Sequence, residues 1–445
     1  MVLPMIKDKL DASTARLLEL VSPKVGIIRS LSKIVTGADE PSPPVIYQAT
    51  LSHFDYRKGE PAARMNAGKG LTETEAVRGA IGEAVEHYCA SQVNPQTVFL
   101  APWSKVEATG VAPPECVLYS ETQYARRNFP YHRWNPQDEV MWTPMRELPE
   151  KREVYAPAAL VYLSSPSARA EDFFTLSNSN GLAAGPNLEF AILHGLYELI
   201  ERDGFLLNWM NRLPAPEVDF PASARLAHSI RLHYARYGTE IRVFNISTDL
   251  PVYAMMCLAL DKTGNGPTVV TGLGCHLNPS VALTKAVLEV CQVHPGEVQR
   301  YHREPPALRL KSYEDVHTLE DHSAFLSIPE RLGEFSFLLN SERRQSLSDL
   351  PDNSQGSEQA DLDFCVDQLI RAGCRVLYAD LTTPDIADYG LSVVRTFATG
   401  LQPMHFGYGE ERLGGQRLFE IARILGHATG TRNESDLNPC PHPLA

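Results

Sequence analysis

Pairs of polar side chains three residues apart recur in three segments of this 445-residue chain. In each segment an alanine is followed seven residues later by Glu and ten residues later by Glu or Gln. The three sets are Ala76, Glu83 and Glu86, then Ala191, Glu198 and Glu201, then Ala282, Glu289 and Gln292. Residues three apart on a helix lie on one face about a turn apart. The repeat therefore predicts three related helices that present the same polar pair.

The second set belongs to the segment HGLYELIERDGF, residues 194–205, in which apolar residues occupy nearly all sides of the expected helix. Most Glu pairs on helices lie on solvated faces, but this pattern is typical of a helix surrounded by protein. Its carboxylates are therefore predicted to enter the interior or a cleft. A buried carboxylate must be paired or bind a cation. Arg202, four residues after Glu198, can offset one charge but not those of Glu83, Glu86 and Glu201 as well.

Small residues stand next to these acids, with Gly79 and Gly82 before Glu83, and Gly195 before Glu198. They leave room for a ligand. Converging oxygen ligands without His or Cys suit Mg²⁺, which usually arrives with phosphates. The residues thus indicate a Mg²⁺-nucleotide site built from helices. No phosphate-binding Gly-x-x-x-x-Gly-Lys-Ser/Thr loop is present, and TGLGCHL matches a dinucleotide loop poorly.

The composition describes an ordinary globular protein with 43% hydrophobic and 21% charged residues. A formal charge of −13 opposes general nucleic-acid binding. Neither a membrane span nor an N-terminal targeting signal is recognisable, so the expected location is cytoplasmic, with no membrane contact. The eight cysteines form no Cys-x-x-Cys pair, and we expect them to be reduced core residues.

The predicted fold class is α+β, a mixed α/β protein, because apolar runs typical of strands alternate with segments of helical period. The polar, Ser-rich segment 341–363 is predicted to be a flexible loop. Strands are expected at residues 45–52, 154–163, 240–247, 252–261, 268–274, 375–381 and 391–397.

Two segments, GKGLTETEAVRGAIGEAVEHY and SNGLAAGPNLEFAILHGLYELIERD, resemble the YcaO family of ATP-dependent enzymes that activate peptide backbone amides. The resemblance implies a YcaO-type fold with repeated helices around a nucleotide cleft. It implies an N-terminal helical extension over 1–21, a YcaO-like domain over 22–437 and a proline-rich tail over 438–445.

In the family, the matching glutamates hold Mg²⁺ and nucleotide phosphates, so the resemblance makes Glu83, Glu86, Glu198 and Glu201 metal ligands and ATP-binding residues. Arg202 would face phosphate, where its fork geometry is suitable. Further ATP-binding residues are expected in segments that contribute to the family's cleft: Glu289, Gln292 and Arg395.

This chain departs from the family pattern at five positions associated with nucleotide binding: Gly79, His87, Pro186, Phe190 and His294. Asn187 and Glu189 lie one residue from two of them, but a shift of one residue turns a helical side chain by about 100°. Either the ATP site is rearranged, or it is impaired. Retention of the four glutamates favours the first alternative.

The chain ends NPCPHPLA, and this tail resembles the alternating-proline C-terminus of azoline-forming YcaO proteins. Alternating prolines favour an extended segment that loses little entropy on docking. By resemblance, the tail residues Pro439, Pro441, Pro443 and Ala445 are assigned to catalysis. Since extended ends bury little core, we expect the tail to be dispensable for the fold. Two lone histidines, His132 and His405, are weaker candidates for a catalytic base.

The resemblance therefore predicts a cyclodehydratase that uses ATP and Mg²⁺ to convert Cys or Ser/Thr of a ribosomal precursor peptide to thiazoline or oxazoline. A leader-peptide-binding or E1-like partner subunit is expected, because only about 20 residues precede the resemblance. A flavin-dependent azoline dehydrogenase is a further possible partner. Two alternatives stay open, a non-catalytic YcaO scaffold subunit and a YcaO enzyme that forms thioamides or amidines.

Overall fold

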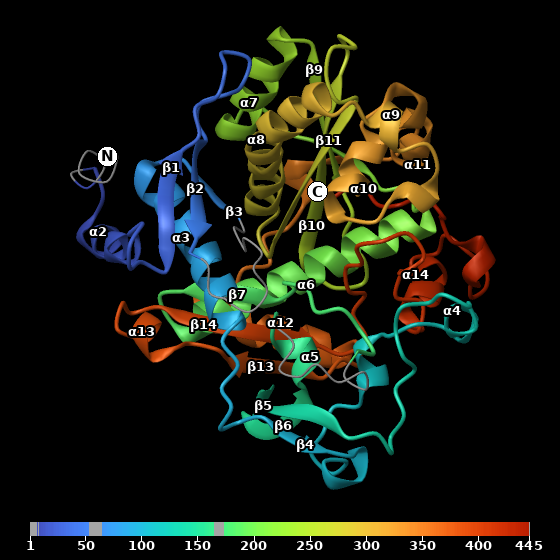
Figure 1. Cartoon of the computed structure of the whole chain (residues 1–445). Coiled ribbons are helices and arrows are strands. Elements are labelled where there is room, and N and C mark those ends of the chain that lie inside the picture. Colours follow the sequence, from blue (N-terminus) through green and yellow to red (C-terminus); the bar gives the residue numbers. More distant parts are fainter. Residues whose placement is uncertain (1–6, 8, 53–64, 164–172, 445) are drawn as a thin grey trace.

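Three β-sheets, with helices between and around them, form the part of the chain that the structure describes (Figure 1). The computed structural model describes residues 7, 9–52, 65–163 and 173–444. Helices and strands both contribute to each core cluster, which confirms the predicted α+β class. No helix in these described ranges is long and apolar enough to cross a membrane.

The first sheet is antiparallel and runs in the order β1-β2-β3, made of β1 (Ile28–Lys33), β2 (Val45–Leu51) and β3 (Met65–Gly70). Helix α3 (Glu73–Ala90) packs against it and begins after Thr72, whose side chain accepts a hydrogen bond from the Glu75 N–H. The described part of the N-terminal extension is helical, with α2 (Ala12–Leu17) followed by a 3₁₀ turn (Leu18–Leu20), and an ion pair joins Asp11 to Arg78 on α3.

The second sheet runs in the order β11-β10-β9-β8-β12, with only β8 and β12 parallel. Its strands are β8 (Glu217–Asp219), β9 (Thr239–Asn245), β10 (Tyr253–Asp261), β11 (Val269–His276) and β12 (Arg344–Ser346). Helices α7 (Arg225–Arg236) and α8 (Pro279–Arg303) cover one face. Alternate residues of β10 point to the two faces, and both sets are buried because protein covers both sides.

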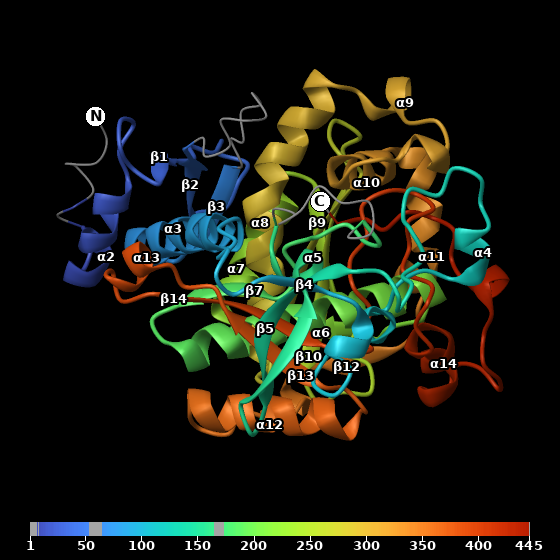
Figure 2. The ribbon, with the colours of Figure 1, turned by 60° about the horizontal axis from the view of Figure 1, so that its bottom comes forward.

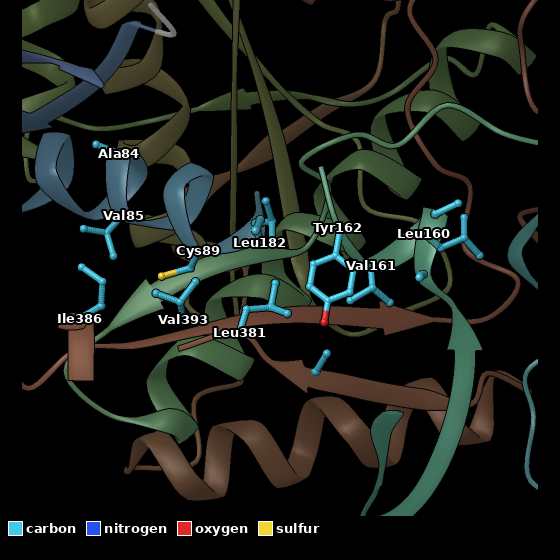
Figure 3. Close-up of a cluster of buried hydrophobic side chains, with 14 of the residues drawn as sticks. Ala84, Val85, Cys89, Leu160, Val161, Tyr162, Leu182, Leu381, Ile386 and Val393 are labelled. Carbon is cyan, nitrogen blue, oxygen red and sulfur yellow. The ribbon is translucent and has the colours of Figure 1, made fainter. Parts of the chain in front are cut away.

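The third sheet runs in the order β4-β5-β13-β14-β7, with β6 paired to β5. Its strands are β4 (Phe99–Ala101), β5 (Val140–Leu148), β6 (Arg152–Pro157), β7 (Leu182–Gly185), β13 (Val376–Asp380) and β14 (Ser392–Ala398). Figure 3 shows apolar side chains of α3, among them Val85 and Cys89, meeting Val393 of β14 and Ile386 of α13 (Pro384–Ala387). Helix α3 is thus packed between the first and third sheets.

Helix α6 (Leu188–Asn211) crosses the middle of the molecule, between the second and third sheets (Figure 1). Its first half is buried with β13, β14 and α12 (Glu358–Arg371), and its second half with β10, β11 and α10 (Leu319–Leu326). Figure 2 shows α12 along the lower margin of the molecule. The all-round burial of α6 explains why HGLYELIERDGF is hydrophobic on nearly every side.

The remaining described α-helices are short: α4 (Glu121–Tyr124), α5 (Ala158–Val161), α9 (Pro306–Arg309), α11 (Ser336–Leu339) and α14 (Arg417–Ile424). All eight cysteines are free and buried, as expected from the sequence.

Two predictions about local structure were wrong in part. Residues 154–163 are not one strand, because β6 ends at Pro157 and α5 follows. Proline lacks the N–H that would continue a ladder, and the sequence AALV has good helix formers. Residues 341–363 are not a loop throughout, since they include β12 and the first turns of α12. Pairing with β8 and burial of Leu362 stabilise this segment despite its polar composition.

Candidate functional site

Three strand–helix units, β3–α3, β7–α6 and β11–α8, carry the repeated polar pairs, and their alanines are all buried: Ala76, Ala191 and Ala282. In the first unit a Cβ on Gly68 would lie 2.0 Å from the Ala80 nitrogen. In the third, a Cβ on Gly274 would lie 2.5 Å from the Ala286 nitrogen. Glycine is required at both positions because the helix approaches the strand so closely. The sequence repeat is therefore a structural repeat.

The two glutamates of α3 each accept a hydrogen bond from a strand backbone. The Ala67 N–H of β3 donates to Glu83 Oε2 over 2.7 Å, and the Ala184 N–H of β7 donates to Glu86 Oε1 over 2.8 Å. Burial raises the pKa of Glu83 to about 7, although the Ala67 N–H and the charge of Lys69 act in the opposite direction. Burial and the charge of Glu83 raise the pKa of Glu86 well above its ordinary value. Both carboxyls would lose their protons more readily beside a cation.

On α6, Arg202 lies between Glu198 and Glu201 without a tight contact to either. Its Nη2 is 3.7 Å from Glu198 Oε1, and its Nη1 is 3.8 Å from Glu201 Oε1. Nη1 is buried and has no hydrogen-bond partner. The Gly181 N–H donates to Glu198 Oε2 over 2.9 Å. Burial raises the pKa of both carboxyls, and Arg202 only partly offsets this effect.

The third helix brings Glu289 and Gln292 to the same place. Gln292 Nε2 donates to the Ala67 carbonyl over 3.0 Å, so the residue of β3 that contacts Glu83 also contacts α8. Lys69 Nζ lies 3.6 Å from Glu289 Oε2. The charge of Glu289 contributes to the raised pKa of both Glu83 and Glu201. Polar residues of three separate helices thus form one cluster, which we call the glutamate cluster: Glu83, Glu86, Glu198, Glu201, Arg202, Glu289 and Gln292.

Two lysines beside the glutamate cluster were not predicted from the sequence. Lys285 of α8 is near Glu201 and Glu289, lies 5.5 Å above the Tyr197 ring, and has a pKa lowered mainly by burial. Lys69 reaches Glu289 from β3. Lys285 occupies an equivalent position in the repeat: it follows Ala282 by three residues, as Gly79 follows Ala76 and His194 follows Ala191. A comparison of the three repeats could therefore have identified Lys285. No comparable sequence signal pointed to Lys69.

The glutamate cluster fits a divalent cation bound together with phosphates. Over the described ranges, no three His, Cys, Asp or Glu side chains are close enough to hold a metal ion by themselves. Mg²⁺ rarely needs such a cage, because one or two carboxylates, water and substrate phosphates usually complete its octahedron. A cation would favour the ionised form of these carboxyls, whose pKa is raised, and a phosphate oxygen would accept a hydrogen bond from the unpartnered Arg202 Nη1.

Several positions that depart from the family pattern have structural roles. His294 Nδ1 lies 2.5 Å from Glu40 Oε1, and the Tyr234 hydroxyl donates to Glu40 Oε2 over 2.7 Å. A Cβ on Gly79 would be 3.1 Å from the Gly68 Cα, so this position favours a small residue.

At the start of α6, Phe190 stacks on His194 with ring centroids 3.8 Å apart. Asn187 is the N-cap of the helix, and its Oδ1 accepts a hydrogen bond from the Phe190 N–H over 2.7 Å. Pro186 is exposed. Asn187 is therefore occupied by the helix end and does not replace the missing side chain at 186.

The tail is packed into the protein as far as the structure describes it, to Leu444. Trp209 Nε1 of α6 donates to the Cys440 carbonyl over 2.9 Å, and the Asn438 N–H donates to the Met210 carbonyl over 2.7 Å. Cys440 and Leu444 belong to the core cluster around the second half of α6. The premise that the tail buries little core is therefore wrong, because these side chains are buried. Ala445 lies outside the described residues.

Within the tail, Pro439 is exposed whereas Pro441 and Pro443 are buried. His442, between the two buried prolines, stacks on His322 with centroids 3.9 Å apart, and its Nε2 contacts the His405 carbonyl over 3.1 Å. The field of Arg202 contributes to the lowered pKa of His442, after burial and the two other histidines. The docked tail thus packs against the second half of α6, the helix that also carries Arg202.

Two other predicted candidates are not part of the glutamate cluster. His405 is buried against His322 and His442, and burial lowers its pKa far below the ordinary value, as in a neutral core histidine. Arg395 of β14 is buried, and its Nη atoms donate to the carbonyls of Asn178 and Leu160. It faces a cavity next to the glutamate cluster, and its charge still acts on Glu198.

Helices in three repeated units that gather carboxylates and one arginine inside a core define a helix-built acidic site, of the class that handles a metal and a nucleotide. The model of the YcaO cyclodehydratase family, described as ATP- and Mg²⁺-binding, matches residues 67–402. This chain belongs to the YcaO family. All seven residues of the glutamate cluster lie in the matched span.

Similarity to individual known proteins agrees with membership of the YcaO family. A solved heterocyclase in complex with substrate and cofactor is similar with a TM-score of 0.81 and 28% identity, covering 97% of this chain and 57% of that chain. This chain thus spans just over half of that heterocyclase. YcaO from Methanopyrus kandleri, bound with AMPPCP and Mg²⁺, shares the fold with a TM-score of 0.63 and 22% identity, covering 90% of each chain. An uncharacterized protein of Methanothermobacter thermautotrophicus is 29% identical over 360 residues, covering 79% of this chain and 85% of that protein.

Proposed function

We propose that this chain is the catalytic YcaO subunit of a peptide-modifying synthetase, using ATP and Mg²⁺ to cyclise Cys or Ser/Thr of a ribosomally made precursor peptide to thiazoline or oxazoline. One observation carries the proposal, namely the glutamate cluster, whose carboxyls come from three repeated units within the family-matched span. The similarity to a heterocyclase in complex with substrate and cofactor supports the same reaction class.

In this reaction, the sulfur or oxygen of the substrate side chain attacks the preceding backbone carbonyl carbon. The resulting oxyanion takes the γ-phosphoryl group of ATP, and cleavage of the C–O bond releases phosphate and leaves a C=N bond in the new ring. The substrate loses one water in total, whose oxygen leaves with the phosphate. ATP supplies the phosphoryl group because an amide oxygen leaves poorly without it. The nucleophile belongs to the substrate, so no catalytic Cys or Ser of the enzyme is required.

The residues of the chain would mainly position and neutralise charge. Glu83, Glu86, Glu198 and Glu201 would hold Mg²⁺ through their oxygens, and the unpartnered Arg202 Nη1 would donate to a phosphate oxygen. Three further residues are proposed at the nucleotide: Glu289, Gln292 and Arg395.

The tail prolines Pro439, Pro441 and Pro443, with Ala445, are proposed to order the peptide at the site. The contact of the docked tail with α6, which carries Arg202, supports this role. A leader-peptide-binding or E1-like subunit would deliver the precursor, and a flavin-dependent dehydrogenase could then oxidise azoline to azole.

The test is a reconstituted reaction of the chain with its partner and precursor, followed by mass spectrometry and phosphate release. We expect loss of one water per modified residue, coupled to phosphate release. Glu198→Gln should lower turnover about 100-fold or more, whereas Glu153→Gln, at an exposed position on β6, should not. Exchange of oxygen for sulfur would point to thioamide formation instead. Turnover unchanged by Glu198→Gln would favour a scaffold role and contradict the proposal.

A further inference from the structure

A small cavity of about 40 Å³ lies next to the glutamate cluster but is not part of it. It is bordered by β14, by the segment 176–180 before β7, and by the loop that follows β14. None of the five glutamates of the cluster lines it. A single water needs about 10–15 Å³ of the same kind of volume. The cavity therefore has room for a small ion but not for a nucleotide.

Three buried side chains border this cavity with a hydrogen-bond donor that has no partner. The residues Arg395, Arg412 and Asn180 are only 3%, 4% and 8% exposed. Arg395 uses its Nη atoms on two backbone carbonyls, and Arg412 Nη2 donates to the Leu176 carbonyl over 3.1 Å. The two Nε atoms and the Asn180 Nδ2 are left without a partner. Buried donors of this kind are rare in folded proteins and require an explanation.

The two guanidinium groups also lack a counter-charge. Within the described ranges, neither Arg395 nor Arg412 forms an ion pair with a carboxylate, whereas Arg417 nearby in sequence pairs with both Asp203 and Asp249. Burial lowers the pKa of Arg395 to about 10, against the influence of Glu198. An unpaired buried charge is costly, so an anion in this place would relieve two charges at once.

The other polar groups at the cavity already have partners. Ser177 Oγ donates to the Tyr162 carbonyl, Asn178 Oδ1 accepts from the Asn180 N–H, and Gln402 Nε2 donates to the Arg412 carbonyl. The rest of the lining is mostly apolar, including Leu199 and Phe397. The unsatisfied groups are therefore all donors, and two carry positive charge, which selects a small anion rather than a cation or a neutral molecule.

We propose that this cavity is a binding site for one small tetrahedral oxyanion of the inorganic phosphate type, held by Arg395, Arg412 and Asn180. Two guanidinium groups match a doubly charged anion better than a single carboxylate. The site includes none of the glutamates and shares only Arg395 with the proposed nucleotide contacts. Phosphate binding in this cavity is therefore tested without nucleotide and apart from cyclodehydration.

Isothermal titration of the full chain with inorganic phosphate tests the proposal, without nucleotide and in EDTA at constant ionic strength. EDTA removes Mg²⁺, so phosphate cannot bind through metal at the glutamate cluster. We expect one phosphate per chain, bound at least tenfold more tightly than acetate. Arg412→Met should weaken phosphate binding at least tenfold. The matched control is Arg343→Met, which removes an arginine from a different cavity and should leave phosphate binding unchanged.

The thermal midpoint measured without phosphate is a second test, because the proposal predicts the direction in which Arg412→Met changes it. Arg412→Met should leave that midpoint unchanged or raise it, because it removes an unpaired buried charge, and it should abolish the rise caused by phosphate in the parent chain. If this variant does not fold, Arg412→Lys keeps the charge but loses the fork, and should fold while binding phosphate more weakly. Absence of saturable binding, equal binding by the Arg412 and Arg343 variants, or acetate binding as tight as phosphate would overturn the proposal.

Discussion

Glu83→Gln should stabilise the metal-free protein at alkaline pH while weakening its binding of Mg²⁺ and nucleotide. The variant keeps the size of the side chain and an oxygen that can accept the Ala67 N–H, but it carries no charge. In the parent chain, burial raises the pKa of Glu83 from 4.5 to about 7. Ionising this carboxyl in the folded state therefore costs about 3 kcal/mol relative to the unfolded chain.

The sign of the pH dependence follows from that pKa. The folded protein binds the Glu83 proton more tightly than the unfolded chain, so this group stabilises the fold fully below pH 4.5, and the benefit is lost as pH rises to about 7. Above pH 7 the parent chain bears the whole cost of a buried carboxylate. Glu83→Gln should then be more stable than the parent by up to about 3 kcal/mol at pH 8, and by less than about 1 kcal/mol at pH 5.

Urea denaturation in EDTA at both pH values measures this difference. The control is Glu75→Gln, at an exposed position on the same helix, which should show no gain at pH 8. With Mg²⁺ and an ATP analogue present, the order should reverse, because the parent gains a ligand that the variant binds at least about tenfold more weakly. A variant that is no more stable than the parent at pH 8 would refute a costly buried carboxylate at Glu83.

Three further predictions concern the structure around the site. Arg417→Ala should destabilise the protein by about 3–5 kcal/mol in chemical denaturation, because it leaves the carboxylate of Asp203 buried and unpaired; a loss below about 1 kcal/mol would contradict this. Gly68→Ala should destabilise strongly, whereas Gly82→Ala, whose Cβ would meet nothing within 4 Å, should be neutral or gain up to about 1 kcal/mol; equal thermal midpoints would refute the close approach. Deleting residues 439–445 should lower turnover, and it should destabilise the fold by about 2–5 kcal/mol, which a lower thermal midpoint would show. An unchanged thermal midpoint would show that the tail contributes little to the stability of the fold.

The sequence predicted the centre of this molecule well because repetition is visible without coordinates. Glu83, Glu198 and Glu289 occupy equivalent places in three strand–helix units, and helical periodicity alone placed each beside its polar partner. The burial of α6 also followed from its composition. The α+β class followed from alternating strand and helix patterns.

Other parts depended on contacts between distant residues, which periodicity does not encode. Asp203 is an acid in the buried helix α6, and its partner Arg417 is 214 residues away in the sequence. The tail looked like a loose proline-rich end because the pocket that buries Leu444 is made by α6, α10 and the segments near them. Lys69 comes from a strand that carries no acidic repeat, and its pairing with Glu289 exists only in three dimensions.

A crystal structure of the chain with Mg²⁺ and a non-hydrolysable ATP analogue tests the central claim most directly. The account predicts at least one Mg²⁺ with carboxylate oxygens of the glutamate cluster at about 2.0–2.1 Å. It also predicts Arg202 Nη1 within hydrogen-bond distance of a phosphate oxygen. A nucleotide bound elsewhere, with Glu83, Glu86, Glu198 and Glu201 unchanged and free of metal, would contradict it.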